Sequence, residues 1–242
     1  MGRKRNRGPC VYCGQPATTR DHIPPQCLFG KKKPSNLITV PACAACNHGA
    51  KLNDEYAMRL ALVDGTERTR AGREVDEAFH RAITRPQAKG LRYGFLRTVH
   101  PVDVFTPSGR LYLGRRLAFD LDWDRMAAWM DRLIRGFFWK IKNRRLPEGY
   151  GTDWHPVTTA PNISLEKEQN QRIISKGPFL DFGDGTFRVR AISSHNESNL
   201  ALFRFDFFLT DGFIGYTVKD HGNGKCSHLV IQEEEMSAAN GE

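Results

Sequence analysis

The chain has 242 residues, of which 40% are hydrophobic and 26% charged, as expected for a globular protein with a hydrophobic core. It contains no apolar run of about 18 residues, which excludes a transmembrane helix, and we expect no membrane partner. The opening MGRKRNRGPC has positive charge without an apolar region behind it and lacks Ser or Thr at position 6, which argues against a secretory signal and N-myristoylation. We therefore expect a cytoplasmic protein whose cysteines are reduced or bound to metal.

The positive charge is concentrated near the N-terminus. The formal net charge is +9, and residues 1–51 contribute +8, because their nine Lys and Arg face Asp21 as the only acid. These basic residues are Arg3, Lys4, Arg5, Arg7, Arg20, Lys31, Lys32, Lys33 and Lys51. Such a segment beside a balanced body indicates a phosphate-rich partner, although a solubilising tail is an equal alternative for residues 3–7.

Changes in composition predict the domain organisation. Residues 1–9 are expected to form a disordered basic arm, and residues 10–63 a domain whose Cys-, Pro- and Gly-rich start needs a staple to fold. Residues 64–235 are expected to form a mixed α/β domain of unknown role, and residues 236–242 a frayed tail. The predicted fold class is α+β.

Hydrophobic periodicity predicts three helices. The first lies within residues 52–63, and in the second Val75, Phe79 and Ile83 share one face before Pro86. The clearest helix covers about residues 122–143, and its apolar stripe is expected to lie in the core.

Alternating and β-branched segments predict the strands. Residues 102–114 are expected to form two short strands around a Pro-Ser-Gly turn, whereas residues 144–175 give only weak signals. Towards the C-terminus, strands are predicted in TFRVRAI, ALFRFDFFL and FIGYTV, with a turn at TDG. Phe occurs on both faces of the second of these strands, so we expect the hairpin to be covered on both sides.

Two Cys-x-x-Cys pairs predict a structural zinc site. Cys10 and Cys13 are separated from Cys43 and Cys46 by 29 residues. Each pair can wrap one side of a tetrahedral ion, and Gly14 suits the tight turn of a zinc knuckle. The gap exceeds the roughly 15–20 residues of a zinc ribbon, so a segment is inserted between the knuckles. The binding energy of Zn²⁺ would then fold this segment.

The remaining thiols and imidazoles are weaker candidates for metal binding. Cys27 is expected to be a buried thiol rather than a fifth ligand. The segment HGNGKCSH contains His221, Cys226 and His228, but its glycines favour a surface turn.

The inserted segment contains Asp21-His22 and Asn36-Leu37, and Asn47 directly follows the last cysteine. In this order, between and after the cysteine pairs, these residues resemble the HNH endonuclease family, whose ββα-metal finger is often stapled by a Cys₄ zinc. The resemblance covers residues 10–51, roughly a fifth of the chain, and rests on five elements in the right order. It implies an N-terminal zinc-stapled ββα-metal (HNH) finger followed by a mixed helical and antiparallel-β body.

The resemblance implies a role for each of these residues. His22 would be the general base that activates water, and Asp21 a carboxylate ligand of a catalytic divalent cation. Asn36 would hold the loop between two strands and help to orient His22, and Asn47 would be the second metal ligand. The family usually has His at this last position, and Asn there favours Mg²⁺ or Mn²⁺. A knuckle shifted by one residue would place His48 there instead.

Two prolines follow the Asp-His pair and are expected to end the strand that carries it. Pro24 biases Ile23 towards an extended conformation, and Pro25 prevents the strand from continuing in a ladder. An extended backbone would direct Asp21 and His22 to opposite sides, one to the metal and one to water.

The implied function is metal-dependent hydrolysis of DNA phosphodiester bonds that leaves 5′-phosphate and 3′-hydroxyl ends, in a phage, mobile-element or defence context of a bacterial or phage-infected cell. Contacts to the DNA backbone are expected from the basic residues of the arm and the inserted loop, namely Arg3, Lys4, Arg5, Arg7, Lys31, Lys32, Lys33 and Lys51. Double-strand cleavage would require a homodimer or two successive nicks. Two alternatives stay open: a non-catalytic zinc-stapled nucleic-acid-binding protein, and a nuclease acting on structured RNA.

Overall fold

The structure is a computed structural model of the chain. It describes residues 8–50, 53–54, 56, 66–106, 108–120, 122–157, 164–175, 179–194 and 198–220. The predictions for the N-terminal arm up to residue 7, for Lys51, for most of the first predicted helix, for HGNGKCSH and for the C-terminal tail lie outside the described residues.

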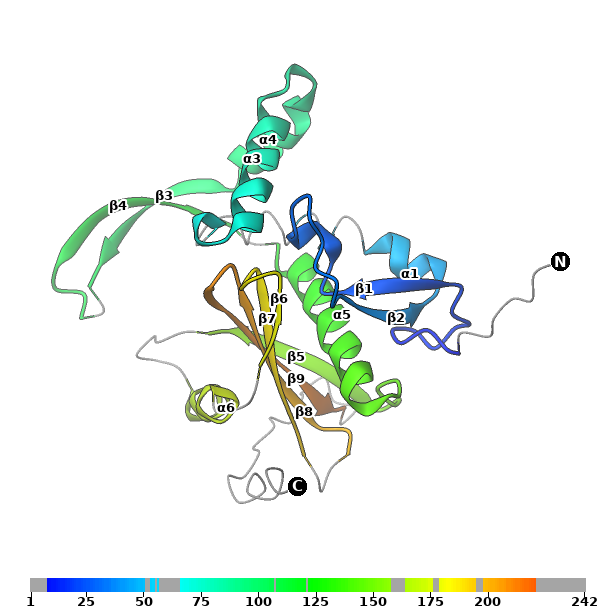
Figure 1. The fold of residues 1–242 in the computed structure, drawn as a ribbon. Coiled ribbons are helices and arrows are strands. Elements are labelled where there is room, and N and C mark those ends of the chain that lie inside the picture. The colour runs from blue at the N-terminus through cyan, green and yellow to red at the C-terminus, as the bar shows by residue number, and fades with distance from the viewer. Residues whose placement is uncertain are drawn as a thin grey trace.

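The N-terminal segment has the predicted ββα order (Figure 1). Strands β1 (Thr19–Ile23) and β2 (Ile38–Ala42) form an antiparallel hairpin, and helix α1 (Ala44–Gly49) follows directly. Strand β1 ends immediately before Pro24, as predicted, and a short 3₁₀ turn, η1 (Gln26–Leu28), begins the loop to β2.

The body is built on a five-stranded antiparallel sheet in the order β5-β9-β8-β7-β6. These strands are β5 (Tyr150–Pro156), β6 (Phe179–Phe182), β7 (Phe187–Ser193), β8 (Ala201–Phe207) and β9 (Thr210–Lys219). Helix α5 (Trp123–Lys142) packs on one face of the sheet and α6 (Leu165–Ser175) on the other. Along β8, Phe203 and Phe205 join the core under α5 whereas Leu202 joins the core under α6, which confirms that this strand is covered on both sides.

Between the finger and α5, the chain forms an extension that projects from the body (Figure 1). It consists of η2 (Thr66–Arg68), α3 (Arg70–Thr84), η3 (Pro86–Ala88), α4 (Lys89–Leu96), β3 (Val99–Phe105) and β4 (Tyr112–Phe119). Among the described strands, β3 and β4 pair only with each other, in an antiparallel ribbon. Helices α3 and α4 meet through Phe79 and Phe95, whose ring centroids lie 5.3 Å apart.

One hydrophobic core joins the finger to the body. It contains Ile23 and Val40 of the hairpin together with residues of α5 and the large sheet. Gly136 allows α5 to approach β1 closely, since a Cβ at this position would lie only 2.7 Å from Cγ1 of Ile23. The finger is therefore packed against α5 and does not stand apart from it.

The α+β class predicted from the sequence is confirmed, as are the helices at α3 and α5 and the strands β3, β4 and β7–β9. Strand β5 and helix α6 occupy the region that gave weak signals. The turn predicted at TDG is wrong: Phe208 and Leu209, both with positive φ (50° and 61°), form it, and Thr210 already belongs to β9. None of the described helices has the length and apolarity needed to cross a membrane.

Candidate metal centre and catalytic pocket

The four predicted zinc ligands are brought together. The Sγ atoms of Cys10, Cys13, Cys43 and Cys46 all lie within 4.8 Å of one another, and those of Cys13 and Cys43 are 3.7 Å apart. A tetrahedral Zn²⁺ with Zn–S bonds of about 2.3 Å requires sulfur atoms about 3.8 Å apart. This group could therefore hold a structural metal such as zinc. Within the described part of the chain, no other three His, Cys, Asp or Glu side chains come as close.

The backbone around the cysteines prepares them for a metal. Gly14 adopts φ +80° and its N–H donates to the carbonyl of Cys10 at 2.9 Å, closing the first knuckle. Cys43 is the N-cap of α1, and its Sγ accepts a hydrogen bond from the N–H of Cys46 at 3.4 Å. This hydrogen bond lowers the pKa of Cys43 to about 7, so the thiolate that binds metal is favoured.

The hairpin, α1 and α5 enclose a cavity of about 450 Å³. Its lining includes three of the predicted catalytic residues, Asp21, His22 and Asn47, together with His48. Asp21 and His22 were expected to point to opposite sides of β1, yet both line this cavity, Asp21 from a buried position and His22 half-buried.

Arg132 of α5 binds Asp21 inside this cavity. Its Nε donates to Oδ2 of Asp21 at 2.7 Å and its Nη2 donates to Oδ1 at 2.5 Å. The hydroxyl of Tyr12 also donates to Oδ2 at 2.6 Å. Asp21 is only 4% exposed and Arg132 only 8%, so each charge depends on the other for compensation.

A second carboxylate, Asp54, shares the same guanidinium. Nη1 of Arg132 and, at 3.1 Å, Nε1 of Trp129 both donate to Oδ1 of Asp54. Burial raises the pKa of Asp54, and the negative charge of Asp21 adds to this effect. Burial alone would lower the pKa of Arg132, but its hydrogen bonds to Asp21 and the charges of both carboxylates outweigh this and raise it. Two carboxyl groups share one guanidinium, so the cavity carries an excess negative charge whenever both are ionised.

Oxygen atoms in the cavity retain capacity for a cation. A carboxylate oxygen has two lone pairs, so Oδ1 of Asp21, which accepts a single hydrogen bond, keeps one. Among the described residues, nothing donates to Oδ2 of Asp54 or to Oδ1 of Asn47, whose Nδ2 donates to Thr19 Oγ1 at 3.1 Å and to the carbonyl of Arg20 at 3.2 Å. Hard oxygen donors of this kind fit Mg²⁺ or Mn²⁺.

The imidazole of His22 is available for proton transfer. It lines the cavity and makes no hydrogen bond or ion pair with any described residue, so a ring nitrogen can accept a proton from water. His48 lines the same cavity from an exposed position one residue after Asn47. Asn47 and His48, the two alternatives for the last position of the motif, thus both line this cavity.

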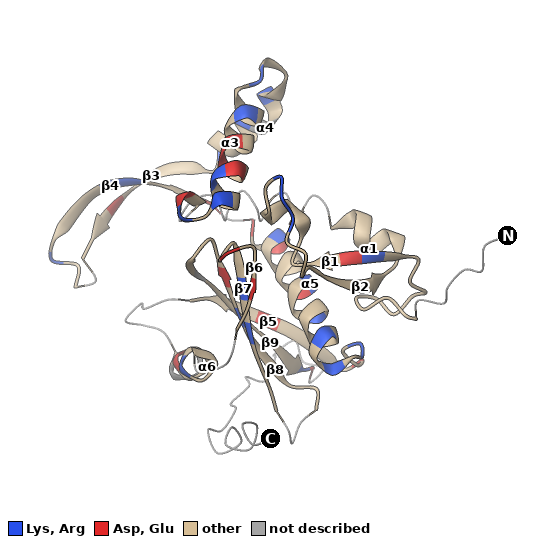
Figure 2. Ribbon diagram, in the orientation of Figure 1, with Lys and Arg blue, Asp and Glu red and all other residues tan. Residues whose placement is uncertain are grey.

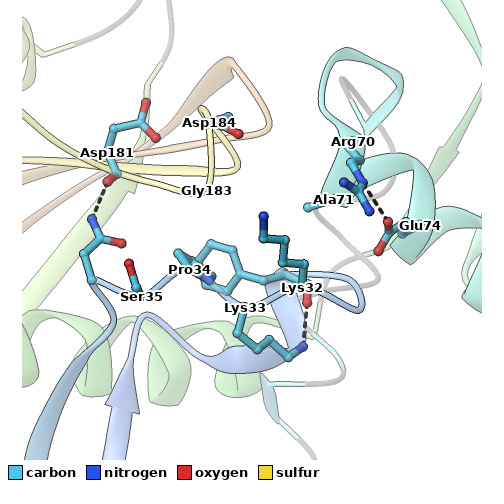
Figure 3. Close-up of a pocket in the computed structure, with 12 residues that line it drawn as sticks. Lys32, Lys33, Pro34, Ser35, Arg70, Ala71, Glu74, Asp181, Gly183 and Asp184 are labelled. Atoms are coloured by element: carbon cyan, nitrogen blue, oxygen red, sulfur yellow. Dashed lines mark hydrogen bonds and ion pairs between the residues drawn. The ribbon is translucent and has the colours of Figure 1, made fainter.

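Asn36 is not brought together with His22. Its Nδ2 donates to the carbonyl of Asp181 at 2.8 Å, which ties the loop before β2 to strand β6. This loop borders a different cavity, of about 540 Å³, whose lining includes Lys32, Arg70 and Asp184 (Figure 3). Asn36 therefore ties its loop to the body of the protein, and its amide makes no hydrogen bond to His22.

Three of the lysines predicted to bind DNA, Lys31, Lys32 and Lys33, lie in the inserted loop and differ in their hydrogen bonds. Nζ of Lys33 donates to the carbonyls of Gln26, Phe29 and Gly30 at 2.8, 2.5 and 2.7 Å, so all its protons are used inside the loop. Burial lowers the pKa of Lys33. All three lysines are exposed, but the side chains of Lys31 and Lys32 make no hydrogen bond to a described residue, and Figure 3 shows Lys32 beside the second cavity.

Sequence reasoning missed Arg132, Asp54 and Tyr12. One signal for Arg132 was available, because it follows Trp129 by three residues and therefore lies on the apolar face of α5. A charge on such a face needs a buried partner. The partners lie in the finger, however, and no local pattern connects them to α5.

Comparisons with family models, with curated proteins and with solved structures found no match to this chain.

Proposed function

We propose that this protein is a metal-dependent endonuclease of the HNH type that hydrolyses phosphodiester bonds in DNA. The observation that supports it most strongly is the convergence of Asp21, His22 and Asn47 on one cavity. Asp21 and His22 lie between the two cysteine pairs of the Cys₄ cluster, and Asn47 directly follows the second pair. An imidazole that makes no hydrogen bond or ion pair with a described residue, beside oxygen atoms that can still accept, is the combination that metal-assisted hydrolysis requires.

Each residue of the cavity has a distinct part in this proposal. Oδ1 of Asn47, with Oδ1 of Asp21 and Oδ2 of Asp54, would hold the divalent cation, which when bound supplies positive charge to the scissile phosphate. His22 takes the proton from the attacking water. Arg132 acts as a positioning residue, because it fixes both carboxylates and neutralises one of their two charges.

The zinc site has a structural part. Cys43 and Cys46 begin α1, and Asn47 is the next residue of this short helix. A metal bound by all four cysteines would fix α1 relative to β1, and with it the position of Asn47 relative to His22.

The proposed function also implies a partner, a mode of cleavage and a cellular setting. DNA is the partner, and the exposed Lys31 and Lys32, in the loop between η1 and β2, would contact it. Cleavage of both strands would require a homodimer or two successive nicks. The protein would act in the cytoplasm of a bacterial or phage-infected cell, in a phage, mobile-element or defence context.

A second candidate function is favoured by the contacts of Asp21. Because both of its oxygens accept hydrogen bonds from Arg132, Asp21 could serve only to join the finger to α5. The protein would then be a zinc-stapled nucleic-acid-binding protein without catalysis.

Nicking of supercoiled plasmid separates these candidates. The zinc-loaded protein is titrated with Mg²⁺ or Mn²⁺, and Asn47→Ala is compared with the wild type at equal zinc content. The endonuclease proposal expects metal-dependent nicking, with Asn47→Ala requiring at least about tenfold more metal. Salt-sensitive binding without cleavage of plasmid or of a structured RNA would support the binding protein instead.

A further inference from the structure

Positive charge is concentrated in the second part of the extension that lies between the finger and α5. Residues 85–117, here called the ribbon extension, contain seven Lys or Arg and a single acid, Asp103, a net charge of +6. Residues 52–242 together carry only +1, so the remainder of that region carries −5. The net charge of residues 52–242 is therefore small although the ribbon extension within them is strongly basic.

Most of this charge is not compensated by the protein. Arg115 pairs with Asp103 at 2.9 Å, directly across the ribbon. The other basic side chains make no ion pair with any described residue, and all except Arg92 are exposed; they are Arg85, Lys89, Arg92, Arg97, Arg110 and Arg116. Figure 2 shows basic residues on α4 and on the ribbon.

The ribbon extension also exposes large apolar side chains. Leu117 is 75% exposed, Tyr112 52% and Phe105 50%, and the rings of the last two lie 5.4 Å apart. Among the described strands, none pairs with the outer edge of β3 or of β4. A two-stranded ribbon is only marginally stable alone in water, so a bound partner would stabilise it.

We propose that the ribbon extension binds duplex DNA, with the β3–β4 ribbon in the major groove and its arginines on the flanking phosphates. This inference rests on the proposed function and names a DNA-binding element for it. The major groove, about 12 Å wide, admits a two-stranded ribbon, and the charge of +6 matches a polyanion. A second copy of the chain is disfavoured as the partner, since two equally basic ribbons would repel each other.

The test compares two double variants that remove equal charge. Arg110→Ser with Arg116→Ser alters the ribbon, and Lys140→Ser with Lys219→Ser alters exposed residues on α5 and β9. Both are made in a His22→Ala background, so that a fluorescent DNA duplex is bound without being cut, and the dissociation constant is measured against salt concentration.

The ribbon variant is expected to bind about tenfold more weakly and to lower the slope of log K against log salt by about 2, because each phosphate contact contributes about 0.9. The control variant should bind like its parent. Equal effects of both variants would overturn the inference, and so would unchanged DNA binding with a loss of self-association in sedimentation.

Failure of this inference is distinguishable from failure of the proposed function. If the wild type nicks plasmid while the ribbon variant binds DNA like its parent, only the ribbon inference falls. If the wild type neither nicks nor binds DNA, both fall.

Discussion

Arg132 on α5 holds Asp21 on β1 by two hydrogen bonds, although 111 residues separate them along the chain. The same guanidinium holds Asp54, so one side chain of the body fixes two carboxylates of the finger. The packing of α5 on the hairpin and the arrangement of the cavity that holds Asp21 and His22 therefore depend on the same side chain.

Loss of Arg132 should destabilise the protein strongly. In Arg132→Leu, Asp21 and Asp54 would remain buried without a cation, and removing one partner of a buried pair costs about 3–5 kcal/mol. Arg135→Leu is the control, since the ion pair of Arg135 with Asp131 lies within one helix and is partly exposed, and should cost about 1 kcal/mol or less. Urea unfolding measures both variants. Similar losses would show that Arg132 has no special part in joining the finger to α5.

Removal of zinc should unfold the finger. Metal analysis is expected to find one zinc per chain, and Cys13→Ser or a strong chelator should abolish it, because structural Zn²⁺ supplies roughly 10–16 kcal/mol of binding energy. Circular dichroism and proteolysis within residues 10–50 report the loss of structure. A chelated protein that stays folded and protected there would contradict a structural role for the metal.

Lys33 and Lys32 should respond differently to the same change. Lys33→Met removes the donor to three loop carbonyls and should lower stability by about 1–3 kcal/mol. Lys32→Met, at an exposed position, should change stability by no more than about 0.5 kcal/mol but weaken DNA binding. Thermal unfolding and DNA titration of both variants test this. A stable Lys33→Met that binds DNA poorly would assign Lys33 to the interface instead.

Cys27 should react slowly with iodoacetamide in the folded protein. Burial and the charge of Asp54 raise the pKa of Cys27 to about 12, so its thiol stays protonated at pH 8. Since the folded state holds this proton more tightly than the unfolded chain, Cys27 adds stability below about pH 8.5, and that contribution is lost as the pH rises towards 12. Mass spectrometry after labelling at pH 8 should find Cys27 modified only on denaturation. Rapid labelling of the zinc-bound native protein would contradict the shift.

Local sequence patterns predicted much of the fold and part of the site. The apolar stripe predicted α5, and the spacing of the cysteines predicted a cluster that the structure assembles. The position of the Asp-His pair before two prolines predicted the end of β1. The helix and the end of the strand depend on residues close together in the chain. The cysteine cluster depends on two Cys-x-x-Cys pairs, each of which can wrap one side of a tetrahedral ion.

The remainder depends on contacts between distant segments. Asn36 reaches Asp181, and Arg132 reaches Asp21, and neither pairing follows from a local period. Strand β5 gave weak signals because it is defined by its pairing with β9, whose residues lie 57 to 69 positions further along the chain, and not by its own alternation. The charge of the ribbon extension was hidden because the acidic residues of the body offset it in the total.

The most direct test of the account is the plasmid-nicking rate of the wild type, His22→Ala and His48→Ala at equal zinc content with saturating Mg²⁺ or Mn²⁺. Both histidines line the same cavity, so His48→Ala controls for changes in its shape. With His22 as the general base, His22→Ala should lower the rate by about 10²–10⁴-fold, whereas His48→Ala should stay within a few-fold of the wild type. Equal rates for the wild type and His22→Ala would contradict the assigned base.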